Sequence, residues 1–222
     1  MAKLFLSGGG NAKQTMKLDN MFISAIPGDK KTLYIPVAMP ESHHTFGECF
    51  DWFKNAMSLH SLDTIDMWTT LNNKKYSELS AYDAIYFGGG NTFRLLDIVK
   101  RSGFDKLIRR YMRSDGIVYG GSAGAIIMGK DIELAGFGGD ADKNMVGLRE
   151  FNGLNIVNGY SIQCHYTIKD DTQMKSYIRK TGINVIALKD NAGIVVEDGK
   201  IRPVGKVYVF EMNKGKVSKR LL

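Results

Sequence analysis

The sequence predicts an α/β fold with a mostly parallel sheet and an antiparallel C-terminal part. Across residues 1–120, short apolar runs of strand length alternate with longer amphipathic segments, a rhythm typical of βαβ units. Glycine clusters stand where these apolar runs end, and ligands bind beyond the carboxyl ends of parallel strands. The last third has short apolar runs separated by tight-turn signals, which favour antiparallel strands.

The parallel part is built from strands and helices that follow one another in turn. Strands are expected at residues 4–6, 32–37, 62–68, 84–87 and 116–119. Helices are expected at residues 14–26, 45–59, 92–100 and 104–113. Three glycine clusters, at residues 8–10, 88–90 and 120–121, follow strands of this set and therefore point to one shared cleft.

The C-terminal part is expected to extend the same sheet. A helix at residues 171–180 precedes strands at 185–188, 193–197, 201–204 and 207–211. Residues 197–200 read Glu-Asp-Gly-Lys, a hairpin turn, because Asp-Gly accommodates the positive φ of tight turns. Residues 213–216 form a second expected turn. A length of 222 residues fits a single domain, 1–222.

Composition excludes several classes of protein. No apolar run approaches the roughly 20 residues that cross a bilayer, so no membrane partner is expected. The net charge is +7, but the basic residues are scattered, which favours a solvated surface over nucleic-acid binding. Cys49 and Cys164 provide neither a disulfide framework nor metal-ligand spacing. We therefore expect a cytoplasmic protein without a metal site.

The sharpest motif is Gly-Gly-Ser-Ala-Gly at residues 120–124. Gly120, Ser122 and Gly124 match the G-x-S-x-G nucleophile elbow, in which a strand turns abruptly into a helix. The serine of such a corner projects into the cleft, and the helix start directs free N–H groups toward developing negative charge. Ser122 is the predicted nucleophile, and the N–H of Ala123 is the predicted first oxyanion donor.

A serine hydroxyl needs a neighbouring base at neutral pH, and the chain has four histidines. His165 ends a short apolar run, where a base would face the nucleophile, and is the predicted base. His43 and His44 follow the second strand and remain the alternative. His60 ends a helical stretch and is expected at the surface.

A third group must orient the imidazole. Asp190 follows a buried-looking strand and gives the chain order Ser, His, Asp; it is the favoured acid. The order Ser, Asp, His of α/β-hydrolases would instead require Asp131, Asp140 or Asp142. The segment 135–142 that contains two of these is glycine-rich and better suited to covering a substrate.

A second oxyanion donor is expected from the glycine turn at residues 88–90. This turn follows a strand and precedes a helix, so its N–H groups are available to an anion. It is not a dinucleotide fingerprint, because Phe93 stands where the last glycine belongs, and no Gly-Lys-Ser/Thr follows for a P-loop. Gly89 or Gly90 is the expected partner of Ala123.

With these motifs the chain resembles the peptidase E and cyanophycinase family of serine peptidases. The resemblance runs along nearly the whole length and is carried by the segments at residues 4–10, 35–38, 87–93, 121–125, 163–166 and 187–194. The Gly-Gly-Gly-Asn and Gly-Ser-Ala-Gly-Ala pair is quite specific to that family. The resemblance implies a three-layer α/β/α sandwich similar to class I glutamine amidotransferases, with serine at the elbow.

The resemblance also implies peptide cleavage beside an aspartyl residue by a Ser-His-Glu triad without metal or cofactor. Asp190 stands where the family has glutamate, one methylene longer. An arginine that holds the aspartyl carboxylate in peptidase E aligns with Gln173, so Lys175 or Arg179 would have to supply the charge. Asn91 of the glycine turn and Gln173 are the predicted substrate-binding residues.

The expected substrate is a small peptide, and the expected assembly is a monomer or a homodimer. Peptides without aspartate are an alternative substrate class for the same chemistry. A family member that binds a small acidic ligand without catalysis is a further alternative. An esterase of the α/β-hydrolase type is disfavoured by the chain order of the triad.

Overall fold

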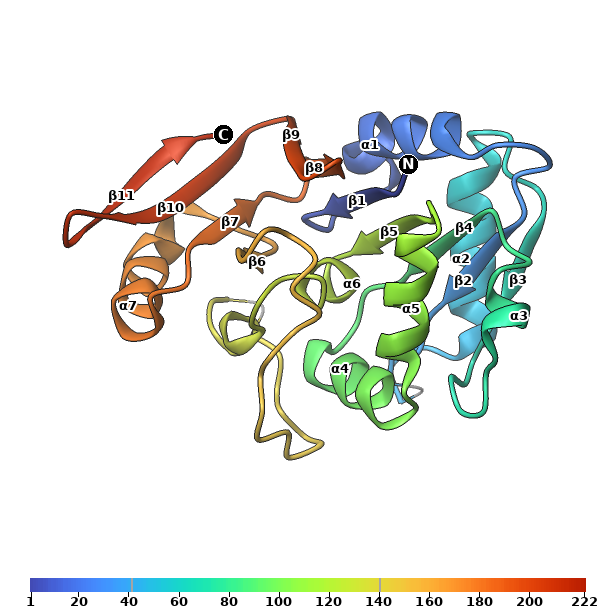
Figure 1. The fold of residues 1–222 in the computed structure, drawn as a ribbon, viewed down its shortest axis with the longest axis horizontal. Helices are drawn as coiled ribbons and strands as arrows, with labels where there is room; N and C mark the ends of the chain where they lie inside the picture. Colours follow the sequence, from blue (N-terminus) through green and yellow to red (C-terminus); the bar gives the residue numbers. More distant parts are fainter. Residues whose placement is uncertain (41, 140) are drawn as a thin grey trace.

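A computed structural model describes residues 1–40, 42–139 and 141–222, and their strands form two sheets (Figure 1). The large sheet has the strand order β3 (Ile65–Met67), β2 (Thr32–Ile35), β4 (Ala84–Phe87), β5 (Ile117–Gly121), β1 (Lys3–Ser7), β8 (Gly193–Glu197) and β9 (Lys200–Val204). The small sheet has the order β11 (Lys216–Leu221), β10 (Val207–Asn213), β7 (Val185–Leu188) and β6 (Ser161–Gln163).

Strand direction follows the predicted change along the chain. In the large sheet, strands β1 to β5 pair in parallel. Strand β8 pairs antiparallel with β1, and β9 pairs antiparallel with β8. In the small sheet β6 and β7 are parallel, and β10 and β11 are added antiparallel. The predicted α/β class with a mostly parallel sheet is confirmed.

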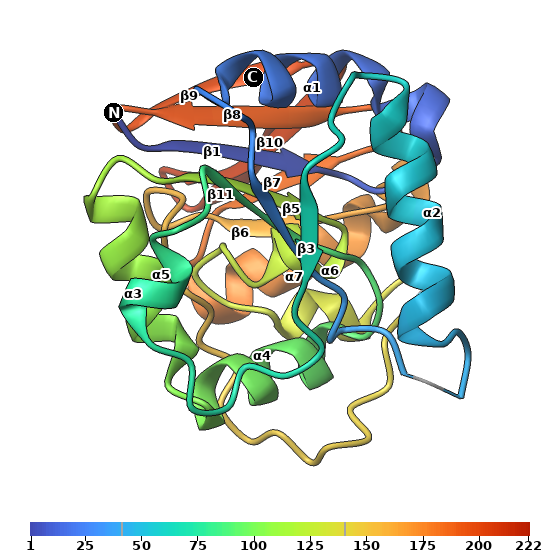
Figure 2. The same ribbon diagram turned by 90° about the vertical axis from the view of Figure 1, so that its right-hand side faces the viewer.

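Helices cover both faces of the large sheet, which gives the three layers. The helices α1 (Ala12–Ala25) and α2 (Phe46–Ser58) lie on one face, and α4 (Thr92–Arg101) and α5 (Phe104–Arg113) lie on the other, with the short α3 (Tyr76–Leu79) beside α5 (Figure 2). Alternate strand residues enter separate cores: Phe5 and Tyr119 pack under α1 and α2, whereas Leu4 and Val118 face α4 and α5. This division follows from the two-residue period of a strand.

Side-chain caps begin both helices of the first face. Asn11 accepts hydrogen bonds from the N–H groups at the start of α1, and the Gln14 side chain accepts the Asn11 N–H in return. Thr45 and Glu48 form the same reciprocal pair at the start of α2. These capping boxes satisfy N–H groups that the helices themselves leave unpaired. None of the helices in the described ranges is both long and apolar enough to cross a bilayer.

The C-terminal strands do not all extend the large sheet as predicted. Only β8 and β9 do so, whereas β7, β10 and β11 build the small sheet, on which α7 (Asp171–Thr181) packs. A separate core including Met174, Ile178, Val185 and Phe210 holds this unit together. The strand expected at residues 62–68 is also shorter, at Ile65–Met67, and the exposed charged strand β11 was not predicted.

Candidate active site

Ser122 stands at the corner between β5 and the short helix α6 (Ala123–Ile126), with φ 49° and ψ −112°. Positive φ is unusual for a residue other than glycine and stores strain where it occurs. The neighbouring glycines permit the corner: a Cβ on Gly120 would lie 2.4 Å from the Gly124 carbonyl oxygen, and one on Gly124 would lie 2.5 Å from that of Phe87. Strand and helix pass each other at distances that exclude any side chain.

His165 follows β6 of the small sheet, and its Nε2 lies 2.8 Å from the Ser122 Oγ. Its φ is also positive, at 53°, and its N–H donates to the Gly8 carbonyl at 3.0 Å. Asp190 follows β7, and its Oδ1 lies 2.7 Å from the His165 Nδ1. The structure therefore joins Ser122, His165 and Asp190 in one hydrogen-bonded series, in the order expected from the sequence.

The glycine loop at residues 8–10 lies against this series. A Cβ on Gly9 would lie 2.1 Å from the His165 Cε1, and one on Gly10 would lie 3.2 Å from the Asp190 Cβ. Both glycines have positive φ, at 116° and 88°. The sequence placed this loop at the cleft without a role, and the structure shows it packed directly on the imidazole.

The described alternative acids form no hydrogen bond with His165. Asp142 accepts the Thr92 N–H at 2.8 Å, and burial raises the pKa of its carboxyl group. Asp131 accepts hydrogen bonds from the Tyr177 hydroxyl and the Glu133 N–H. Asp140 lies outside the described residues. Among the candidate acids that the structure describes, Asp190 is the one whose carboxylate contacts His165.

The other three histidines do not contact Ser122. His60 has its Nδ1 2.7 Å from the Asn20 Oδ1, and His44 lies 4.0 Å from a Glu48 carboxylate oxygen at the start of α2. Both His43 and His44 are exposed on the segment after β2. Of the four histidines, His165 is therefore the one that contacts Ser122.

The glycine turn after β4 passes close to Ser122. A Cβ on Gly89 would lie 3.4 Å from the Ser122 Cβ, within van der Waals contact. The flanking N–H groups of Gly88 and Asn91 donate to the backbone carbonyls of Ile35 and Ala38. Within the described ranges, the N–H groups of Gly89, Gly90 and Ala123 have no protein acceptor, and Ala123 is fully buried.

The structure does not bring the two predicted substrate-binding side chains to Ser122. Asn91 caps α4: its Oδ1 accepts the Arg94 N–H, and its Nδ2 donates to the Lys143 carbonyl, each at 2.9 Å. Gln173 lies on α7 and lines a different, smaller pocket beside Glu133. Both ends of the Asn91 amide are thus used within the protein, and the Gln173 side chain faces another surface.

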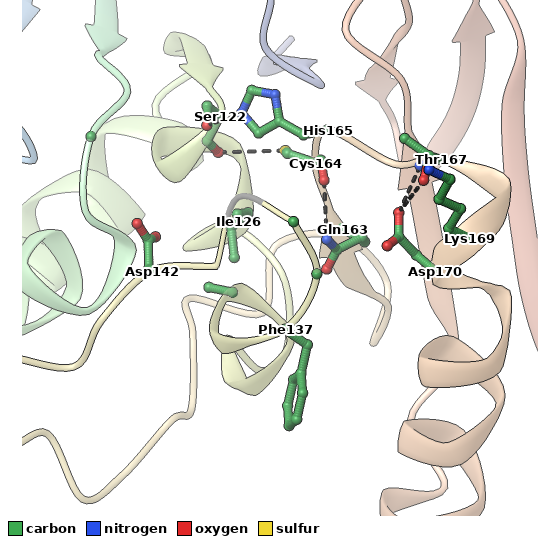
Figure 3. A pocket seen from close by; sticks show the side chains of 14 residues that line it. Ser122, Ile126, Phe137, Asp142, Gln163, Cys164, His165, Thr167, Lys169 and Asp170 are labelled. Atoms are coloured by element: carbon green, nitrogen blue, oxygen red, sulfur yellow. Dashed lines mark hydrogen bonds between the residues drawn. The ribbon is translucent and has the colours of Figure 1, made fainter.

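A cavity of about 480 Å³ opens beside Ser122 and His165. Figure 3 shows its wall, where Asp142 and Phe137 come from the segment after α6 and Gln163, Cys164 and His165 follow one another at the end of β6. The lining residues are Gly90, Ser122, Ile126, Ala135, Phe137, Gly138, Gly139, Asp142, Gln163, Cys164, His165, Thr167, Lys169 and Asp170. Lys175 and Arg179 are not among them.

Polar groups in this cavity were missed by the sequence analysis. Gln163 is 7% exposed, and its Oε1 has no hydrogen-bond partner in the described structure. Asp170 is 8% exposed, with one carboxylate oxygen accepting from the Thr167 N–H and hydroxyl. Lys169 is the cation of the lining set. The position of Gln163 two residues before His165 was the available signal, because alternate strand residues share a face.

The sequence from residue 4 to residue 204 matches the family model described as peptidase family S51. The chain belongs to this family. It is 32% identical over 182 residues to an uncharacterized peptidase of Listeria monocytogenes, covering 81% of this chain and 84% of that one. It is 29% identical over 164 residues to an uncharacterized peptidase of Pasteurella multocida, covering 74% and 71%.

Two solved structures of peptidases share the fold. A crystal structure of a candidate peptidase E protein from Listeria monocytogenes superposes with a TM-score of 0.71 at 26% identity, covering 92% of this chain and 98% of that one. A peptidase from an acI-B1 Actinobacterium gives a TM-score of 0.72 at 18% identity, covering 99% and 94%, and shows likeness of fold alone. The family match and these relatives identify the protein as a serine-type peptidase of the peptidase E type.

Proposed function

We propose that this S51 peptidase hydrolyses short peptides through an acyl-enzyme formed on Ser122. The observation that carries the proposal is the hydrogen-bonded series from the Ser122 Oγ through His165 to Asp190, at 2.8 and 2.7 Å. Such a series couples removal of the hydroxyl proton to an oriented imidazole, which makes an otherwise weak nucleophile reactive at neutral pH.

The reaction begins when the Ser122 Oγ attacks the peptide carbonyl carbon and its proton passes to the His165 Nε2. The Nδ1–H of His165 donates to Asp190, which stabilises the imidazolium that forms. The N–H groups of Ala123 and of Gly89 or Gly90 donate to the oxyanion of the tetrahedral intermediate. Nε2 then protonates the leaving amine as the C–N bond breaks, and water releases the acyl group by the same steps in reverse.

The substrate class depends on the charge that the cavity accepts. Asp-Xaa dipeptides are one candidate, with Lys169 as the cation available to an aspartyl side chain. Peptides whose first residue is neutral or basic are a second candidate, and the two cavity carboxylates, Asp142 and Asp170, favour it. Carboxylates facing a bound aspartyl group repel it, and Gln173, aligned with the family's arginine, lies outside the cavity.

The nucleophile is tested with a fluorophosphonate probe and mass spectrometry of the modified peptide. We expect one adduct on Ser122 and strongly reduced labelling in His165→Ala, with Ser102→Ala as the control that labels normally. A folded protein that does not label at Ser122 would contradict the proposal and support a ligand-binding role without catalysis.

The substrate class is tested with a dipeptide panel that varies the first residue over Asp, Asn, Ala and Lys. Preference for Asp over Asn supports the aspartyl candidate and predicts that Lys169→Ala removes that preference. Preference for Ala or Lys supports the second candidate and predicts that Asp170→Asn weakens selection of Lys.

A further inference from the structure

A second pocket, of about 430 Å³, lies on the other side of the Gly89–Gly90 turn from the cavity. Its walls come from the end of β2, the segment after it and one side of α2. It is lined by Tyr34, Met39, His44, Glu48, Cys49, Trp52, Gly89 and Gly90. Gly90 lines this pocket and the cavity beside Ser122 alike, so the two spaces meet at the proposed oxyanion turn.

Trp52 gives this pocket its chemical character. The indole is 50% exposed, whereas the next residue on α2, Phe53, is fully buried and stacks on Tyr34 with ring centroids 4.2 Å apart. Met39 and Cys49 add apolar surface, and the exposed side chains of His44 and Glu48 supply the polar groups. A large exposed aromatic side chain in a concave apolar pocket is typical of a ligand-binding site.

The two pockets open toward opposite faces of the large sheet. The cavity is walled by Ile126 and Ala135, which belong to the core shared with α4 and α5. The second pocket is walled by Tyr34 and Cys49, which belong to the core under α1 and α2. Ser122 follows the carboxyl end of β5, between these two faces and beside Gly89.

We propose that the Trp52 pocket binds the side chain of the substrate residue that follows the scissile bond, and that it prefers a large apolar or aromatic one. The inference rests on the proposed hydrolysis at Ser122. A carbonyl held at the turn directs its acyl and amine substituents in different directions. The acyl residue occupies the cavity with its buried polar groups, and the amine residue crosses Gly90 to the apolar pocket. This assignment gives His44, whose role the sequence left open, a place beside the leaving residue.

The kinetic test uses dipeptides that share a first residue and end in Phe, Leu, Ser or Gly. We expect wild-type kcat/KM to favour Phe over Gly by about tenfold or more, since an apolar side chain of that size is then buried. Trp52→Ala should reduce this ratio to near unity, and Trp52→Phe should retain most of it. Leu59→Ala is the matched control, because Leu59 is exposed at the end of the same helix and outside the pocket.

Two kinetic results would overturn the inference. One is a Phe-to-Gly ratio that Trp52→Ala leaves unchanged. The other is a Trp52→Ala effect on selection of the first residue, which would assign the pocket to the acyl side. A concentration-dependent dimer that dissociates in Trp52→Ala, with the ratio unchanged, would instead identify a second copy of the chain as the occupant.

A binding measurement separates this inference from the proposed hydrolysis. The chain has two tryptophans, and Trp68→Phe leaves Trp52 as the fluorescent reporter while keeping an aromatic ring beside Phe104. Phenylalanine amide, which resembles the leaving residue, should change the fluorescence saturably, and glycine amide should not. A saturable fluorescence change without cleavage of any peptide would refute the proposed hydrolysis but would still show that the pocket binds an aromatic side chain. Cleavage with neither saturation nor a Trp52-dependent ratio would refute the pocket alone.

Discussion

The large and small sheets contribute different halves of the candidate active site. The large sheet carries Ser122 at the end of β5 and Gly89 after β4, whereas the small sheet carries His165 after β6 and Asp190 after β7. The proposed nucleophile and oxyanion turn thus form within one unit, and the proposed base and its acid form within another. The 2.8 Å contact between Ser122 and His165 is the point where the two units meet.

The end of β1 holds this junction together. The carbonyl of Ser7 accepts the Ser122 N–H at 3.2 Å, and that of Gly8 accepts the His165 N–H at 3.0 Å. Gly8 also donates its N–H to the Ala192 carbonyl at 2.9 Å, just after Asp190. Because the hydrogen-bonded series crosses from one unit to the other, it can be broken while each unit stays folded. Variants at the junction and variants within a unit should therefore differ in their effect on kcat.

The largest effect is expected from either side of the junction contact. Ser122→Ala and His165→Ala should each lower kcat by about 10⁵-fold, because nucleophile and base act as one unit. The double variant should be no worse than either single one. Steady-state kinetics on the best dipeptide measures this, with thermal unfolding as the control for folding. Turnover within tenfold of wild type in Ser122→Ala would contradict the mechanism.

Within the small-sheet unit, Asp190→Asn should lower kcat by about 10²- to 10⁴-fold while leaving the fold unchanged. The lower end is included because the Asp190 side chain is 47% exposed, so water can partly replace it. Asp142→Asn, in the cavity wall, should change KM more than kcat. A loss of kcat in Asp142→Asn, together with a change of KM alone in Asp190→Asn, would instead assign the orienting role to Asp142.

At the junction itself, Gly9→Ala should lower kcat by about 10²-fold, since its Cβ would lie 2.1 Å from the His165 ring and must displace it. Gly28→Ala is the matched control: its φ is also positive, at 57°, but no atom lies within 4 Å of an added Cβ. Equal loss of activity in the two variants would show that backbone strain, rather than the imidazole contact, is responsible.

The smallest effect concerns a buried acid of the large-sheet unit. Asp19 is 2% exposed, accepts the Tyr119 hydroxyl at 2.8 Å, and has its carboxyl pKa raised by burial. The folded state therefore holds a proton that the unfolded state loses first, and the free energy of unfolding falls as pH rises from 3.8, the ordinary pKa of an aspartyl carboxyl, through the higher folded pKa. Asp19→Asn should remove this fall, a difference on the order of 1 kcal/mol.

Urea unfolding of wild type and Asp19→Asn between pH 4 and 8 measures the difference. Kinetic constants at pH 7 should stay near wild type, because Asp19 lies away from the cavity lining. A wild-type curve that rises relative to the variant over this range would show that Asp19 is stabilised in its ionised form instead.

Local signals predicted most of the large-sheet unit and the ends of two strands of the small sheet. The elbow at residues 120–124 and the strand ends before His165 and Asp190 were readable because motif, strand and turn are short-range patterns. The split of the C-terminal strands was not readable, since which sheet a strand joins depends on tertiary packing such as that of Met174 and Phe210. Asp170 lines the cavity for the same non-local reason.

Asn91 illustrates a signal that was available but interpreted otherwise. An asparagine directly before a helix is a preferred N-cap, and the structure uses its side chain in this way. For Gln173, alignment with the family's arginine was insufficient, because which face of α7 meets the cavity depends on how the small sheet docks. Chemistry carried by backbone corners was thus easier to predict than chemistry carried by long side chains.

The position of β1 between β5 and β8 has a consequence for folding during synthesis on the ribosome. Gly8 is synthesised long before its two backbone hydrogen-bond partners, His165 and Ala192. Contacts between such distant parts of a chain form late in folding. A nascent chain shorter than residue 193 lacks the strand that pairs with β1 on that side, so we expect hydrolytic activity only after synthesis has passed this point.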